Sequence, residues 1–152
     1  MSYYDIMRAD LTLDEGERLK PYKDQFGNIS IGRGRNLTGV GISKAEMEMM
    51  YTDDASVAEA TAMIVFTDFW NYSDVRKAAL ANLCFNLGQE KMETFTNFIA
   101  FVKAQYWEGA ASDLLGTQYA KEVPERASRR AAQLRSGCWT LSGRFSTTSA
   151  TG

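Results

Sequence analysis

Hydrophobic side chains recur every three to four positions along most of the chain, which is the spacing of a buried helix face. The clearest helix start is the run from Ser43 to Glu46, a capping box in which the hydroxyl and the carboxylate accept backbone N–H groups. It predicts a helix over about residues 43–66. The same spacing, with proline and glycine near the ends, predicts further helices over residues 4–13, 73–88, 96–102, 110–115 and 124–135.

One segment breaks the helical pattern. Between Pro21 and Gly41 there are five glycines, and the run from Asn28 to Ile31 alternates polar and apolar residues. This pattern predicts short strands joined by turns. The predicted fold class is therefore α+β, mainly α, with a small β-element near the N-terminus. Residues 142–152 are small and polar, and we expect them to form a flexible tail.

The composition narrows the chemistry that the protein can perform. The chain has 152 residues, a net charge of −2 and no histidine. Catalysis by Ser–His–Asp or Cys–His groups and zinc binding by histidine are therefore excluded, and carboxylates are the leading candidates for acid–base work. The two cysteines are too few for a disulfide scaffold or a cysteine-only zinc site. We expect neither a metal nor another cofactor.

Charge and hydropathy also bear on the partners. A pI near 5.2 argues against nucleic acid as the main partner. No stretch approaches the roughly 18 apolar residues of a membrane span, and the charged N-terminus is unlike a signal peptide. Residues 121–152 carry six basic and two acidic side chains. Either a solvated helix face or an anionic ligand would explain this bias.

Three polar residues flank the predicted β-element: Glu15, then Asp24 nine residues later, then Ser30 six residues beyond. Glycoside hydrolysis needs two carboxyl groups, one protonated to donate to the leaving oxygen and one ionised to activate water. A nearby hydroxyl can orient that water. By spacing alone, two solubilising surface charges remain the commoner explanation. The run from Gly32 to Arg35 is neither a dinucleotide fingerprint nor a P-loop, because the third glycine and the Gly-Lys-Ser/Thr ending are absent.

These three residues belong to a longer pattern. Residues 13–24 read LDEGERLKPYKD and residues 27–34 read GNISIGRG. The pattern closely resembles the phage-type lysozymes, the muramidases of glycoside hydrolase family 24, which have a Glu, eight residues, an Asp, five residues and a Thr. The resemblance covers roughly residues 4–140, and it continues in order through VRKAALANLCFNLG at 75–88, FTN at 95–97, YWEGAA at 106–111, PERA at 124–127 and RSGCW at 135–139.

The resemblance implies a single two-lobed lysozyme domain over residues 1–152. A small lobe, about residues 12–50, holds the β-element, and the helix over about residues 43–66 joins the lobes. A helical lobe covers about residues 67–140 together with the N-terminal helix. The implied substrate is the glycan strand of peptidoglycan. The implied reaction is cleavage of the β-1,4 bond between N-acetylmuramic acid and N-acetylglucosamine, with inversion, leading to bacterial cell-wall lysis.

The resemblance also assigns catalytic roles. By family position, Glu15 is the general acid, Asp24 is the carboxylate that activates water, and Ser30 is the hydroxyl that holds the water. Two positions depart from the family pattern: Ser30 replaces a threonine, and Arg35 replaces a histidine. In the family that histidine pairs with an aspartate on the inter-lobe helix, so we predict an ion pair between Arg35 and Asp54.

Other family positions imply contacts beyond the catalytic groups. Arg126 matches an arginine that contacts the catalytic glutamate. The implied substrate-binding residues are Gly34, Phe85, Asn86, Asp113 and Gln118.

Three functions compete at this point. The first is an active muramidase, which we expect to be a monomer made in the host cytoplasm that acts on periplasmic or cell-wall peptidoglycan after release. The second is a non-catalytic cell-wall-binding or virion structural module of the same fold. The third is a hydrolase of related glycans such as chitin. The intact pair Glu15 and Asp24 favours the first. The same pair argues against a lytic transglycosylase, whose chemistry needs no water-activating Asp.

Overall fold

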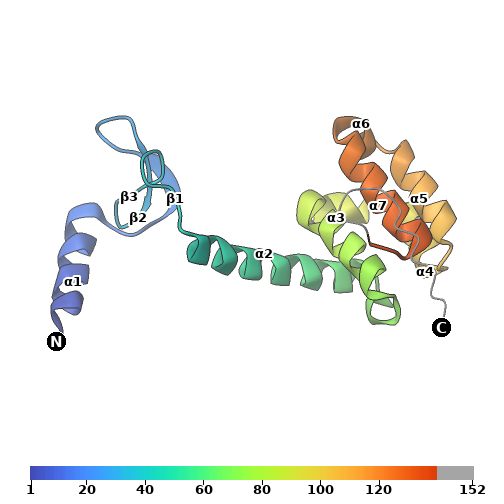
Figure 1. Ribbon diagram of the computed structural model, residues 1–152, viewed down its shortest axis with the longest axis horizontal. Helices are drawn as coiled ribbons and strands as arrows, with labels where there is room; N and C mark the ends of the chain where they lie inside the picture. The colour runs from blue at the N-terminus through green and yellow to red at the C-terminus, as the bar shows by residue number, and fades with distance from the viewer. Residues whose placement is uncertain (140–152) are drawn as a thin grey trace, which may run out of the picture. The chain divides into compact units, whose positions relative to one another are not determined.

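The computed structural model describes residues 1–139, and Figure 1 shows the order of the elements. The contacts divide the chain into two compact units, residues 1–50 and the residues from 51 onward. The first unit contains a helix and three strands, the second contains most of the helices, and one helix runs from the first into the second. The predicted mainly helical α+β class is confirmed. The predicted tail, 142–152, lies outside the described residues.

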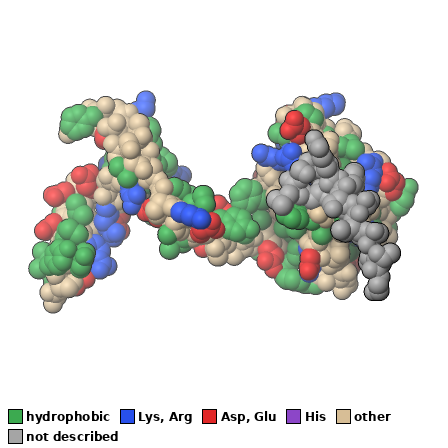
Figure 2. All heavy atoms as spheres, viewed as in Figure 1, with side chains coloured by type: hydrophobic (Ala, Val, Ile, Leu, Met, Phe, Trp, Pro, Cys, Tyr) green, Lys and Arg blue, Asp and Glu red, His purple; other side chains and the backbone are tan. Residues whose placement is uncertain are grey.

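Helix α1, Tyr3–Glu15, opens the first unit. It ends at Gly16, whose φ of 73° is a conformation that glycine adopts without steric cost. The division of the chain groups α1 with the sheet, whereas the resemblance assigns it to the helical lobe. None of its residues is buried, and Figure 2 shows hydrophobic side chains on its surface, which include Tyr3, Tyr4, Ile6, Met7, Leu11 and Leu13.

The predicted β-element is a three-stranded antiparallel sheet of order β1-β2-β3. Its strands are Arg18–Lys23, Ile29–Gly32 and Arg35–Asn36. The first strand begins three residues before Pro21, where the sequence predicted the element to start. Proline is compatible with this position because β1 is an edge strand, on which a missing N–H need not disrupt the ladder.

Helix α2, Lys44–Val65, starts at the predicted capping box. Ser43 N donates to Glu46 Oε2 at 2.7 Å, and Glu46 N donates to Ser43 Oγ at 3.1 Å. These reciprocal bonds satisfy backbone donors that the first turn of a helix leaves unpaired. The predicted helix over residues 43–66 is confirmed to within one residue at each end.

The second unit is built from one 3-10 turn and five further helices among the described residues. Their bounds are Phe69–Asn71 (η1), Asp74–Glu93 (α3), Thr96–Lys103 (α4), Trp107–Gly116 (α5), Gln118–Glu122 (α6) and Pro124–Ser136 (α7). Helix α5 packs on α4 and α7, and α7 also packs on α3 and α6. The largest fully buried side chains of this unit are all apolar: Phe98, Leu80, Leu83, Met92, Leu114, Leu134 and Val102.

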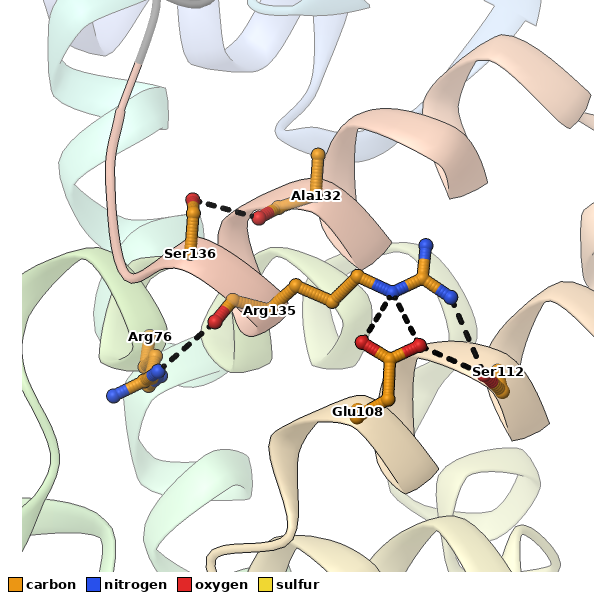
Figure 3. Close-up of polar contacts among 6 residues, drawn as sticks. All are labelled: Arg76, Glu108, Ser112, Ala132, Arg135 and Ser136. Atoms are coloured by element: carbon orange, nitrogen blue, oxygen red, sulfur yellow. Dashed lines mark hydrogen bonds and ion pairs between the residues drawn. The ribbon is translucent and has the colours of Figure 1, made fainter. Parts of the chain in front are cut away.

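Polar side chains also tie α3, α5 and α7 together (Figure 3). Arg135 Nε lies 2.9 and 3.0 Å from the two carboxylate oxygens of Glu108, and its Nη2 donates to Ser112 Oγ at 3.2 Å. From α3, Arg76 donates to the backbone carbonyls of Leu134 and Arg135 at 2.9 and 3.2 Å. These bonds satisfy carbonyls at the end of α7 that have no partner within the helix.

The sequence predicted the helix ends less well in the second unit. Gly88 was predicted to end a helix, and its φ of 72° does break the helical geometry, but helix continues beyond it to Glu93. Helix α5 begins three residues before the predicted start. The short elements η1 and α6 were not predicted. A five-residue helix such as α6 has too few turns to show periodicity, and it depends on the hydroxyl of Thr117, which accepts from Ala120 N at 3.2 Å.

Candidate active site

The first unit contains a pocket of about 670 Å³. It lies where the end of α1, the β1–β2 turn and the β2–β3 turn meet. Four residues that the sequence analysis singled out line it: Glu15, Asp24, Ser30 and Gly34. The fold therefore brings together residues spread over twenty positions of the sequence.

Glu15 reaches the pocket because it is the last residue of α1. Its carboxyl group lies directly against the backbone of Gly34: a Cβ atom built on Gly34 would stand 3.0 Å from Glu15 Cδ and 3.2 Å from Oε2. Gly34 also has a φ of 82°, in the left-handed region that favours glycine. The position therefore requires glycine twice over, for its backbone and for the close approach of the carboxyl group.

Asp24 is held by the β1–β2 turn. Its Oδ1 accepts hydrogen bonds from the backbone N–H groups of Phe26 and Asn28, both at 2.9 Å, and its Oδ2 accepts one from Asn28 Nδ2 at 3.1 Å. Partial desolvation raises the pKa of Asp24, but the hydrogen bonds from Asn28, Phe26 and Gly27 outweigh it, and the pKa lies below its ordinary value. The geometry thus favours an ionised carboxylate.

Asn28 was not among the predicted site residues, although the sequence around it carries a signal. In turns that begin with Asp, the carboxylate commonly accepts a hydrogen bond from the backbone N–H group two residues later. An amide at the end of the turn then has a carboxylate within reach. Asn28 fixes Asp24 with both its backbone and its side chain.

Ser30 occupies the centre of the sheet, paired with Tyr22 on β1 and Asn36 on β3. Only 3% of its surface is exposed, yet it lines the pocket. Within residues 1–139 its hydroxyl makes no hydrogen bond to another residue, so both its donor and its acceptor capacity remain available on the pocket side. Such a hydroxyl is suited to binding a water molecule.

The predicted partner of Arg35 is replaced in the structure. Arg35 Nη2 pairs with Glu46 Oε1 at 2.8 Å, rather than with Asp54. Arg35 Nη1 also donates to the carbonyl of Gly41 at 3.3 Å. The physical reason is the short connection between β3 and α2, which brings Arg35 to the first turn of the helix. Asp54 lies eight residues further along α2, roughly 12 Å along the helix axis.

The remaining predicted substrate-binding residues belong to the second unit. Phe85 is exposed and lines a hollow of about 270 Å³ with Tyr51 and Trp139. Asn86 Nδ2 donates to Asn82 O at 2.7 Å. Asp113 is partly buried on α5. Their contact with substrate, and that of Gln118, stays a prediction.

Arg126 was expected to contact Glu15. Within the second unit its Nη1 donates to the side-chain oxygen of Asn86. Arg126 also lies at the first turn of α7, next to Pro124. Its effect on the catalytic carboxyl group stays a prediction.

Residues 1–139 bring together no group of three or more Cys, Asp or Glu side chains placed to hold a metal ion. None of their helices combines the length and the apolar character needed to cross a bilayer.

Comparison with known proteins agrees with this chemistry. The chain is 28% identical over 148 residues to probable T4-type lysozyme 2 of Dictyostelium discoideum, covering 78% of this chain and 87% of that protein. It is 24% identical over 156 residues to probable T4-type lysozyme 1 of the same organism, covering 84% and 92%. Residues 13–133, which include the whole pocket, match the phage lysozyme family. The chain therefore belongs to the phage lysozyme family and is a glycoside hydrolase that acts on peptidoglycan.

Proposed function

We propose that this lysozyme cleaves the β-1,4 bond between N-acetylmuramic acid and N-acetylglucosamine by acid–base catalysis with inversion, and that it serves to lyse bacterial cell walls. The observation that carries the proposal is the pocket of the first unit, in which Glu15, Asp24 and Ser30 face one space. Two carboxyl groups with different environments are what glycoside hydrolysis requires.

Asp24 takes the role of the base. Both favourable acceptor positions of Oδ1 are occupied by the turn, and Oδ2 accepts only from Asn28. A carboxylate has about four lone-pair positions, so one on Oδ2 remains for a water molecule. The lowered pKa of Asp24 keeps it ionised and able to accept a proton from that water during attack.

Glu15 takes the role of the acid. It donates its proton to the glycosidic oxygen as the bond to the anomeric carbon breaks, and the leaving sugar departs as a neutral alcohol. Water, bound between Asp24 and the hydroxyl of Ser30, attacks the opposite face of the anomeric carbon and passes its proton to Asp24. One water is consumed, one C–O bond is broken and one C–O bond is formed, with inverted configuration at the anomeric carbon. Proton exchange with solvent then returns Glu15 to its protonated form and Asp24 to its ionised form.

The test measures turnover and products together. Glu15→Gln and Asp24→Asn should each reduce the rate of clearing of a peptidoglycan suspension by at least about 100-fold, the lower end of general acid–base contributions. Asp10→Asn is the matched control, because Asp10 is an exposed acid on the same helix outside the pocket. Near wild-type turnover by Glu15→Gln would refute the assignment of the acid.

Product analysis tests the reaction itself. Mass spectrometry of the released muropeptides should show reducing N-acetylmuramic acid ends, which carry one water more than anhydro-sugar products. NMR of the first product formed should show the α-anomer, as inversion requires. Anhydro ends would indicate a transglycosylase. Binding to peptidoglycan without any cleavage would favour the alternative, a non-catalytic wall-binding module of the same fold.

A further inference from the structure

Arg33, in the turn between β2 and β3, binds two side chains near the end of α1. Arg33 Nε donates to Thr12 Oγ1 at 2.8 Å, and Arg33 Nη2 pairs with Oε1 of Glu17. Thr12 lies three residues before Glu15 and Glu17 two residues after it. One planar guanidinium, with donors in a fixed fork, therefore links the chain on both sides of Glu15 to the sheet.

The hydrogen bonds of Thr12 are mutually compatible. Its hydroxyl donates to the carbonyl of Arg8 at 2.8 Å, which leaves the oxygen lone pairs free to accept from Arg33. Its own carbonyl accepts from Gly16 N at 3.0 Å and closes the helix. Thr12 is thus fixed within the last turns of α1, and a bond to its side chain acts on the helix end itself.

Gly34, the residue after Arg33, makes a third contact between this turn and the end of α1. Gly34 lies against the carboxyl group of Glu15, as described above. Arg33 itself does not line the pocket. Whatever it does for catalysis must therefore pass through the residues that it holds.

We propose that Arg33 is a positioning residue for Glu15: by binding Thr12 and Glu17 together it sets the direction in which the Glu15 carboxyl group enters the pocket. The inference rests on the proposed role of Glu15 as the acid. The side chains of Arg33 and Glu17 are 41% and 56% exposed, and ion pairs this exposed contribute little to stability. The role is geometric, because displacing a reacting group by about 1 Å can reduce a rate about 100-fold.

Steady-state kinetics on a soluble peptidoglycan oligosaccharide separate positioning from folding. Arg33→Ala should lower kcat by about 10- to 100-fold, leaving KM within about twofold and the thermal midpoint unchanged. The matched control is Arg8→Ala, since Arg8 is also exposed, lies on α1 as Thr12 does, and pairs with Asp5 at 3.0 Å, away from the β2–β3 turn. Unchanged kcat in Arg33→Ala would overturn the proposal, as would an equal loss in Arg8→Ala.

A second set of variants guards against misfolding. Thr12→Val removes the acceptor with little change in shape and should also lower kcat. Arg33→Ala combined with Thr12→Val should lose no more than Arg33→Ala alone, because the bond that Thr12→Val removes is already absent in Arg33→Ala. Full multiplication of the two losses would overturn the coupling. Arg33→Lys should recover part of the activity, since an ammonium group can reach one acceptor but lacks the fork that reaches both.

Glu15→Gln separates this inference from the proposed function. If Glu15→Gln is inactive while Arg33→Ala keeps wild-type kcat, the acid stands and the positioning role fails. If Glu15→Gln keeps its activity, the assignment of the acid fails, and the role of Arg33 fails with it.

Discussion

Replacing Gly34 with alanine places a methyl group against the carboxyl group of Glu15. The new Cβ would lie 3.0 Å from Cδ, 3.1 Å from Cγ and 3.2 Å from Oε2 of Glu15. These separations are several tenths of an ångström below the usual 3.5–4.0 Å between non-bonded carbons. The side chain of Glu15 must therefore move, and it can do so because it is exposed.

Gly34→Ala should affect stability and rate for different reasons. The φ of 82° at Gly34 is a left-handed conformation, which costs a residue with a Cβ about 1–2 kcal/mol. The displaced carboxyl group adds little to that, because its far end is free to rotate. Catalysis is more sensitive: moving the acid by several tenths of an ångström up to about 1 Å should reduce kcat roughly 10- to 100-fold.

Gly32→Ala is the matched control for this variant. Gly32 is the last residue of β2, two positions before Gly34, and has a similar φ of 68°, but a Cβ at that position would meet nothing within 4 Å. Urea unfolding should give similar destabilisation for the two variants, whereas a peptidoglycan turbidity assay well below the melting temperature should show the large loss only for Gly34→Ala. Equal losses of activity in the two variants would show that the close approach of Gly34 to Glu15 does not matter for catalysis.

Three further predictions concern the same unit. Asn28→Ala removes a side-chain donor to Asp24 and should raise the Asp24 pKa toward its ordinary value, so the acid limb of the pH–rate profile should move to higher pH; an unmoved limb would contradict this reasoning. Because the pKa of Asp24 is lowered in the folded protein, the stability that its ionised form contributes is present above the unfolded pKa of about 4. That stability is lost as the pH falls through the folded pKa. Ser30→Ala should cut kcat while costing less than about 1 kcal/mol in urea unfolding, since the hydroxyl has no partner to lose among residues 1–139. A double-mutant cycle on Arg35→Ala and Glu46→Ala should show a coupling at low salt that shrinks near 1 M salt, and zero coupling would show that the ion pair does not form in solution.

Local signals in the sequence predicted several elements well. The capping box at Ser43 and Glu46 fixed the start of α2 because both partners lie within one turn of each other. Gly16 and Gly137 ended α1 and α7 because left-handed φ angles at a helix end favour glycine. Where the local signal is weaker, the prediction was less accurate: the five-residue helix α6 was not predicted.

Within the candidate site, the sequence alone determined the identities of the chemical groups. The absence of histidine left carboxylates as the acid–base candidates, and the spacing of Glu15, Asp24 and Ser30 within the family pattern selected which ones. The fold then brought all three to one pocket. Composition and motif spacing are enough to identify these groups, because both are properties of the sequence itself.

Only the tertiary structure decided which side chains these groups meet. Arg35 pairs with Glu46 instead of Asp54, Arg33 reaches back 21 positions to Thr12, and Gly34 lies against Glu15. None of these pairs has a spacing that a helix or strand would fix. They depend on how a turn of the sheet packs against the end of α1 and the start of α2, and that packing arises from the sum of contacts in the folded unit rather than from any local pattern.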